Sequence, residues 1–100
     1  MKKIASHAGQ LRLIGITRSA ALEYATAGIR VNAVCPGTID TPLLRHTSSA
    51  DDEARYVGGQ AIKRFGKPQE IASAVTWLCS DEASFVTGVA LPVDGGYTAQ

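Results

Sequence analysis

The chain has 100 residues, of which 45% are hydrophobic and 19% charged, a composition typical of one small folded domain and not of a disordered segment. Ten basic and nine acidic side chains give a net charge of +1 with no long run of either sign, so neither nucleic acid nor a membrane surface is indicated as a partner. No apolar stretch approaches the roughly 20 residues of a membrane span, and the two widely spaced cysteines suit neither a redox pair nor a zinc site, so we expect a cytoplasmic protein without a metal.

The first predicted element is a helix from Ala8 to Ala27. Its apolar residues recur at helical spacing, and Gly28 stands where a helix C-cap is expected. Residues 29–35 are rich in β-branched side chains and end at Pro36-Gly37, which predicts a buried strand followed by a turn. The apolar residues assigned to the helix are Leu11, Ile14, Ala21, Leu22 and Ala25.

Two further helices are predicted in the middle of the chain. Hydroxyl and acidic residues at 48–53 indicate the start of a short helix that reaches about Tyr56 and is broken by Gly58-Gly59. Pro68 lies in the first turn of a longer helix that is expected to end near Ser80-Asp81. The apolar stripe of this longer helix is formed by Ile71, Val75, Leu78 and Cys79.

Residues 89–94 predict a second strand, in which Pro92 suits an edge strand or a bulge better than a central strand, because proline cannot donate to a ladder. The two strands are separated by helices and not by a hairpin, so parallel pairing in an α/β fold is expected. No linker divides residues 1–100, which are expected to form a single unit. Because parallel sheets are normally covered by helices on both faces and have more than two strands, we expect this unit to be part of a larger domain with strands upstream.

The segment from Asn32 to Pro42 carries the strongest functional signal. A strand that delivers Pro-Gly at its carboxyl end, followed by exposed backbone amides and a hydroxyl, suits a planar amide ligand in the crevice above a parallel sheet. An ordinary turn from strand to loop is the alternative, and the spacing alone gives the two interpretations about equal weight.

Four stretches of the sequence form an ordered set: TRSAALEYA at 17–25, GIRVNAVCPG at 28–37, RFGKPQEIA at 64–72, and VTG at 86–88 with VDGG at 93–96. In this order they resemble the C-terminal portion of the short-chain dehydrogenase/reductase family. The resemblance extends from about residue 13 to residue 97 and implies a Rossmann-type, doubly wound parallel sheet, of which this chain would supply two strands and flanking helices. It also implies binding of NAD or NADP, interconversion of small alcohols and ketones, and assembly as a homo-oligomer.

The same resemblance implies which residues contact the cofactor. It places Pro36, Gly37, Ile39 and Thr41 at the nicotinamide, with the backbone at Ile39 meeting the carboxamide and the Thr41 hydroxyl close by. The stretch from Pro42 to about Lys63 would cover the substrate and set specificity.

Two features of that family are not found in these 100 residues. The catalytic Tyr-x-x-x-Lys unit would fall on Ser6 and Gln10 in one register, or on Lys3 and His7 in another, and neither register supplies a phenol beside a cation for proton transfer. The glycine-rich phosphate loop is also missing. We therefore expect no catalytic residue in this chain and no activity from it alone. The alternative function is a non-catalytic oligomerisation module.

Overall fold

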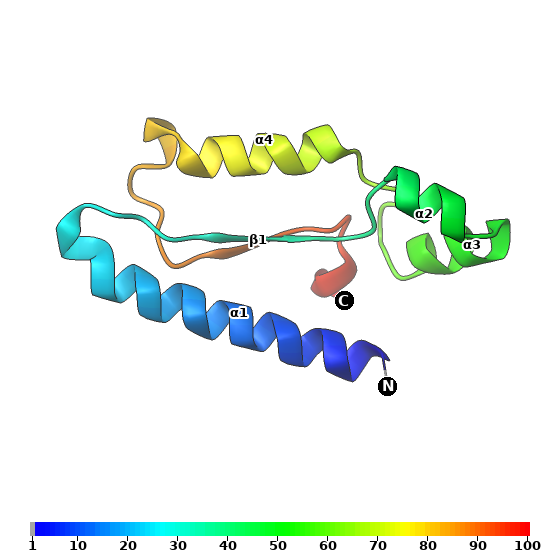
Figure 1. The fold of residues 1–100 in the computed structure, drawn as a ribbon, viewed down its shortest axis with the longest axis horizontal. Coiled ribbons are helices and arrows are strands. Elements are labelled where there is room, and N and C mark those ends of the chain that lie inside the picture. Colours follow the sequence, from blue (N-terminus) through cyan, green and yellow to red (C-terminus); the bar gives the residue numbers. More distant parts are fainter. Residues whose placement is uncertain (1) are drawn as a thin grey trace.

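Two parallel strands lie between two long helices in the computed structural model, which describes residues 2–100 and, from Leu11 onward, their side chains (Figure 1). Strands β1 (Ala33–Pro36) and β2 (Ala90–Val93) pair in parallel. Helix α1 (Lys2–Tyr24) covers one face of this sheet and α4 (Pro68–Cys79) covers the other. The predicted parallel α/β fold, with two strands and flanking helices, is confirmed.

Helix α1 continues into a 3-10 turn, Ala25–Ala27, and ends at Gly28, where φ is 79°. The predicted helix is therefore confirmed, although its start is earlier than expected. Its predicted apolar face is only partly right, because Leu11 and Leu22 are 69% and 81% exposed. Thr17 and Ala21, one helical turn apart, are buried instead. The side of the helix that meets the sheet is thus narrow and lined by small side chains.

The first strand is shorter than predicted, since it begins at Ala33 and not at Ile29. Immediately before this strand, the side chain of Asn32 makes the hydrogen bonds to the β2 side that backbone groups would make within a sheet. Its Nδ2 donates to the Val86 carbonyl at 2.9 Å, and its Oδ1 accepts from the Val89 N–H at 3.0 Å. Backbone pairing starts only at the Ala33 N–H, which donates to the Val89 carbonyl at 2.8 Å.

The predicted short helix is confirmed as α3 (Ala50–Gly58), whose N-cap Ser49 accepts the Asp52 N–H at 3.2 Å. A further helix, α2 (Pro42–Thr47), precedes it and is capped by Thr41, although the periodicity of residues 38–49 is too weak to mark it in the sequence. Both helices lie beyond the carboxyl end of β1 (Figure 1). The radius of gyration is 15.4 Å, against about 13 Å for a compact domain of this length.

Helix α4 begins at Pro68, as predicted, and its sheet-facing stripe is narrower than expected. Leu78 is 5% exposed, whereas Val75 is 43% exposed and Cys79 is also exposed. Val75 and Cys79 flank a hollow beside Val34, on the outer side of β1. In the described part of the chain no strand pairs with that outer edge, so these two side chains stay uncovered.

Pro92 lies at a position of β2 where its missing N–H removes no hydrogen bond to β1. The N–H groups of Ala33 and Gly37 donate to the Val89 and Val93 carbonyls, so alternate residues of β2 face β1. Pro92 is out of phase with these residues, and its backbone nitrogen therefore faces away from β1. Of the two expected positions for Pro92, the structure shows an edge strand and not a bulge, because the register with β1 runs without a break from Ala90 to Val93.

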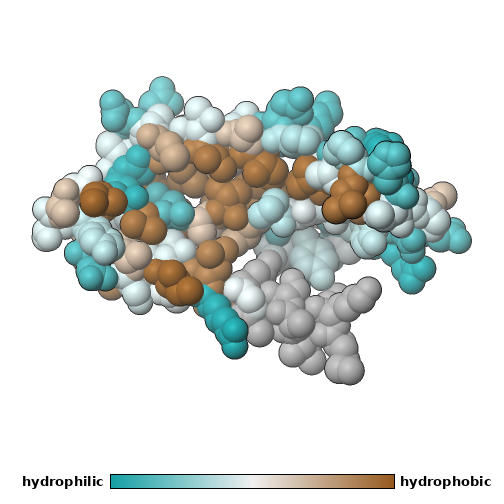
Figure 2. Space-filling model, viewed as in Figure 1, coloured by the Kyte–Doolittle hydropathy of each residue, from teal (hydrophilic) through white to brown (hydrophobic). Residues whose placement is uncertain are grey.

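The apolar core is small. Among the described side chains, the buried apolar residues are Ala21, Leu78 and Ala83. Figure 2 shows apolar residues reaching the surface in a band between α4 and the strands. Within residues 2–100, none of the helices combines the length and the apolarity that crossing a bilayer would need.

Candidate functional site

The segment 37–41 leaves the carboxyl end of β1 and runs beside the loop that enters α4. There, Ile39 and Gly66 form an isolated parallel bridge. The Gly66 N–H donates to the Thr38 carbonyl at 2.9 Å, and the Asp40 N–H donates to the Gly66 carbonyl at 2.8 Å. This pairing holds the segment extended past the end of the strand.

The bridge leaves the backbone N–H of Ile39 unpaired within residues 2–100. In an extended segment successive peptide groups point to opposite sides. Because the Thr38 carbonyl and the Asp40 N–H face Gly66, the Ile39 N–H faces the other way. A fixed, free N–H at the carboxyl end of a parallel strand can donate to an amide or carbonyl oxygen of a ligand.

The other three predicted cofactor residues lie around Ile39, and each has a different role. Pro36 is the exposed last residue of β1. A Cβ at Gly37 would lie 2.7 Å from the Asp94 Cα, so this position requires glycine. Thr41 caps α2, and its Oγ1 accepts the Leu44 N–H at 3.2 Å, which leaves the hydroxyl hydrogen free to be donated.

A hollow of about 330 Å³ opens beside the segment, at the carboxyl ends of both strands. Gly37 and Ile39 line it, whereas Pro36 and Thr41 do not. The structure therefore brings two of the four predicted residues to the hollow and leaves the other two next to it. Its remaining walls come from the loop before α4, the first turn of α4 and the turn after β2.

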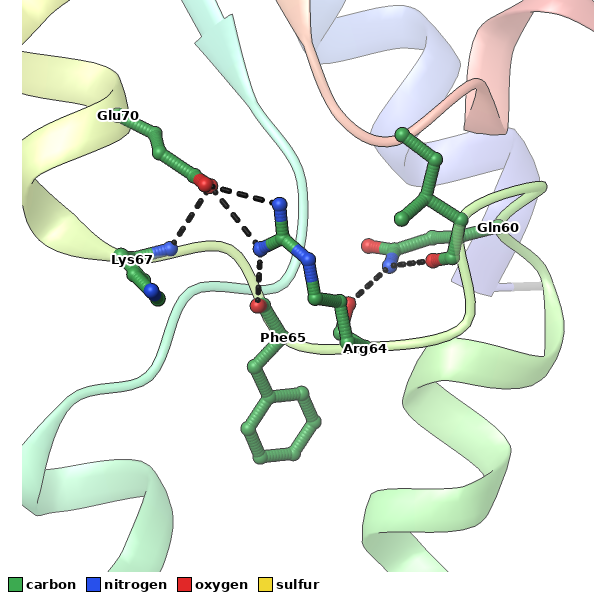
Figure 3. Close-up of polar contacts among 6 residues, drawn as sticks. Gln60, Arg64, Phe65, Lys67 and Glu70 are labelled. Carbon is green, nitrogen blue, oxygen red and sulfur yellow. Dashed lines mark hydrogen bonds and ion pairs between the residues drawn. The ribbon is translucent and has the colours of Figure 1, made fainter.

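An ion pair fixes the loop that presents Gly66 (Figure 3). Arg64 Nη2 lies 2.9 Å from Glu70 Oε1, and Arg64 Nη1 donates to the Phe65 carbonyl at 3.0 Å. Glu70 Oε2 also accepts the Lys67 N–H at 3.1 Å. The hydrogen bond from Arg64, followed by that from Lys67, lowers the pKa of Glu70, so the ion pair persists to a lower pH than the ordinary pKa of a glutamate would allow.

Sequence reasoning missed Gln60, which is 3% exposed and lines the hollow. Its side chain bonds to the Thr38 N–H and to the carbonyls of Ile62 and Arg64. No sequence signal marks this residue, because a glutamine that follows two glycines is typical of an exposed loop. Only the fold shows that three segments close around it.

The positions considered for the Tyr-x-x-x-Lys unit are Lys3, Ser6, His7 and Gln10, and they lie outside the side chains that the structure describes. The stretch predicted to cover a substrate contains α2 and α3, on the side of the molecule where β1 ends (Figure 1).

A hollow at the carboxyl ends of parallel strands, with helices on both faces of the sheet, is characteristic of the Rossmann-type α/β class. Comparison with known proteins narrows this class. A family model described as enoyl-(acyl carrier protein) reductase matches residues 5–98. The chain belongs to the short-chain dehydrogenase/reductase family.

The relatives include several dehydrogenases. Cis-4-hydroxycyclohexanecarboxylate dehydrogenase of Sinomonas cyclohexanicum is 51% identical over 92 residues, which are 92% of this chain and 36% of the relative. Cyclohexanol dehydrogenase of an Acinetobacter species is 50% identical over 86% of this chain and 33% of its own length. The chain thus spans about a third of the length of these curated relatives.

Solved structures show the same arrangement. A short chain dehydrogenase family protein from Francisella tularensis superposes with a TM-score of 0.81 at 40% identity, over 89% of this chain and 41% of that protein. A mutant 4-hydroxyisoleucine dehydrogenase in complex with NADH and succinate gives a TM-score of 0.84 at 37% identity, over 93% and 39% of the two chains.

Proposed function

We propose that this chain forms the nicotinamide side of an NAD(P)-dependent oxidoreductase that interconverts small alcohols and ketones. The observation that carries the proposal is the unpaired N–H of Ile39, held at the carboxyl end of β1 in a family member. Support comes from the relatives, which are named for the oxidation of cyclic alcohols, and from a structural neighbour that is complexed with NADH.

The residues present fit the nicotinamide end of such a cofactor. The Ile39 N–H would donate to the carboxamide oxygen, the Thr41 hydroxyl would supply a second donor, and Gly37 would let the backbone approach closely. When bound, the nicotinamide ring supplies the hydride acceptor or donor, and this chain holds and orients it. The 100 residues contain no glycine-rich loop for the diphosphate, so we expect the chain alone to bind the dinucleotide weakly.

We propose further that the 100-residue chain alone does not turn over substrate. Hydride transfer to a ketone needs a group that donates a proton to the developing alkoxide, and the sequence contains no Tyr-x-x-x-Lys unit for this purpose. Sustained oxidation of cyclohexanol by the purified chain with NAD or NADP would contradict this statement.

Thermal unfolding of the chain with and without saturating NAD and NADP tests the cofactor proposal, because a ligand that binds only the native state raises its apparent melting temperature. A rise with one dinucleotide supports the proposal and identifies the preferred cofactor. Identical transitions with both dinucleotides and with buffer would contradict it.

A second candidate function is self-association without catalysis. It is favoured by large apolar side chains that stay exposed, namely Leu22 at 81%, Trp77 at 44% and Phe85 at 102%. In this proposal the chain forms a homo-oligomer and lies in the cytoplasm. The two free cysteines agree with a reducing compartment. Sedimentation as a monomer at high concentration would contradict the self-association.

A further inference from the structure

Gln60 is the most deeply buried polar side chain in the described part of the chain, at 3% exposure. It lies at the junction of three segments, namely the turn after β1, the loop between α3 and α4, and the turn after β2. Glycines allow the backbone to close around its amide on two sides. A Cβ at Gly37 would lie 2.9 Å from the Gln60 Oε1, and a Cβ at Gly95 would lie 3.4 Å from its Nε2.

The side-chain amide of Gln60 uses both of its donors and its acceptor. Its Oε1 accepts the Thr38 N–H at 3.1 Å. Its Nε2 donates to the Ile62 carbonyl at 3.2 Å and to the Arg64 carbonyl at 2.9 Å (Figure 3). The partners fix the orientation of the amide, because a backbone N–H can only donate and a carbonyl can only accept.

The bond to Thr38 comes at the point where backbone pairing with β2 stops. The Gly37 N–H still donates to the Val93 carbonyl at 3.0 Å, but the next N–H along the chain, that of Thr38, is held by Gln60. The peptide that follows, whose N–H belongs to Ile39, is held through its own carbonyl, which accepts the Gly66 N–H at 2.9 Å. Gln60 and Gly66 therefore fix two successive peptide groups.

We propose that Gln60 is a positioning residue for the cofactor contact. This inference rests on the proposed function of Ile39. The bond from the Thr38 N–H to Gln60 and the bond from the Gly66 N–H to the Thr38 carbonyl together fix both sides of Thr38, and so steady the free Ile39 N–H. The bonds from Gln60 to the carbonyls at 62 and 64 tie this segment to the loop leaving α3. The nicotinamide segment and the stretch 42–63 that covers the substrate are thereby held as one unit.

The first test is made on the unmodified chain. Both amide hydrogens of Gln60 are bonded inside the fold, whereas Gln69 lies on the exposed side of α4 and makes no such bond within residues 2–100. By NMR, the Gln60 side-chain hydrogens should exchange with solvent at least about tenfold more slowly than those of Gln69, the ratio expected for a bonded and buried donor. Equal exchange rates would overturn the inference.

The second test compares Gln60→Met with Gln69→Met, which makes the same chemical change on the surface. Gln60→Met should speed exchange of the Thr38 amide roughly tenfold, as expected for the loss of one hydrogen bond, and should leave the Gly37 amide protected. It should also move the Ile39 amide resonance and weaken NAD binding, whereas Gln69→Met should change neither. Thr38 exchange that stays the same in a folded Gln60→Met chain would overturn the inference.

The outcomes separate the inference from the proposed function. If the unmodified chain shows no response to NAD at Ile39, the proposed function fails, and with it the cofactor part of the role of Gln60. If NAD binds the unmodified chain and binds Gln60→Met equally well although Thr38 has loosened, the positioning role fails alone. If Gln60→Met loses protection throughout α4, the variant is unfolded. The comparison of Gln60 and Gln69 side-chain exchange in the unmodified chain then decides whether the inference stands.

Discussion

The side-chain oxygen of Asn32 accepts the backbone N–H of Val89 at 3.0 Å, across 57 positions in the sequence. This bond, with that from Nδ2 to the Val86 carbonyl, joins the two strands just before their backbone pairing begins. It fixes the register that sets Ala33 opposite Ala90. The same register carries Pro36 to Val93 at the other end of the sheet, where the hollow opens.

Asn32→Asp should destabilise the chain by about 1–3 kcal/mol, because the carboxylate faces the Val86 carbonyl with no hydrogen to donate. Gln69→Glu makes the same chemical change at an exposed position of α4 and should shift stability by no more than about 0.5 kcal/mol. Urea unfolding followed by circular dichroism measures both changes. Equal effects of the two substitutions would contradict this role of Asn32.

Gly37→Ala should destabilise the chain by roughly 1–3 kcal/mol, because the new Cβ would lie 2.7 Å from the Asp94 Cα, a backbone atom that cannot turn aside as the end of a side chain could. Gly15→Ala is the matched control, since nothing lies within 4 Å of a Cβ there. In the interior of α1 this control should stabilise by about 0.5–1 kcal/mol. Thermal unfolding measures the direction of both changes, and a neutral Gly37→Ala would show that the segment after β1 does not pass so close to Asp94.

Asp40 and Arg45 form a two-armed ion pair across the start of α2, with Arg45 Nε 2.6 Å from Asp40 Oδ1. The hydrogen bond from Arg45 lowers the pKa of Asp40. Because the folded value lies below the unfolded value of about 3.9, the pair supports α2 above that pH and stops doing so as the pH falls through the folded pKa. Titration of the Asp40 carboxyl resonance should show a higher pKa in Arg45→Gln, and an unchanged value would contradict the pairing.

Ile39→Pro removes the N–H that we assign to the cofactor, and that N–H makes no bond within the described residues. Ile39→Val keeps the N–H and most of the apolar side chain. Loss of one hydrogen bond should weaken NAD binding by roughly tenfold in the proline variant, and the valine variant should bind as the unmodified chain does. Equal binding by the two variants, measured by fluorescence titration with NADH, would rule out the Ile39 N–H as the contact.

The sequence predicts elements well where local chemistry decides them. The Ser49 cap, Pro68 in the first turn of α4 and Gly28 after α1 all mark boundaries that the structure confirms. The sequence does not predict the boundaries that are determined by contacts between residues distant along the chain. The strand starts late because Asn32 bonds to residues more than 50 positions away, which no local pattern records.

The candidate site shows the same division. Pro36, Gly37, Ile39 and Thr41 follow from a contiguous motif, and the structure places all four at one end of β1. Gln60 could not be found in this way, because its burial depends on three segments that meet only in the folded chain.

The central claim is that segment 37–41 binds a nicotinamide through the N–H of Ile39. The most direct measurement is an NMR titration of the ¹⁵N-labelled chain with NAD, followed at the Ile39 amide and, as a distant reference, at the Ala72 amide of α4. We predict that the Ile39 resonance moves in a saturable way while that of Ala72 does not. An Ile39 resonance that stays in place at millimolar NAD, or one that moves no more than that of Ala72, would contradict the claim.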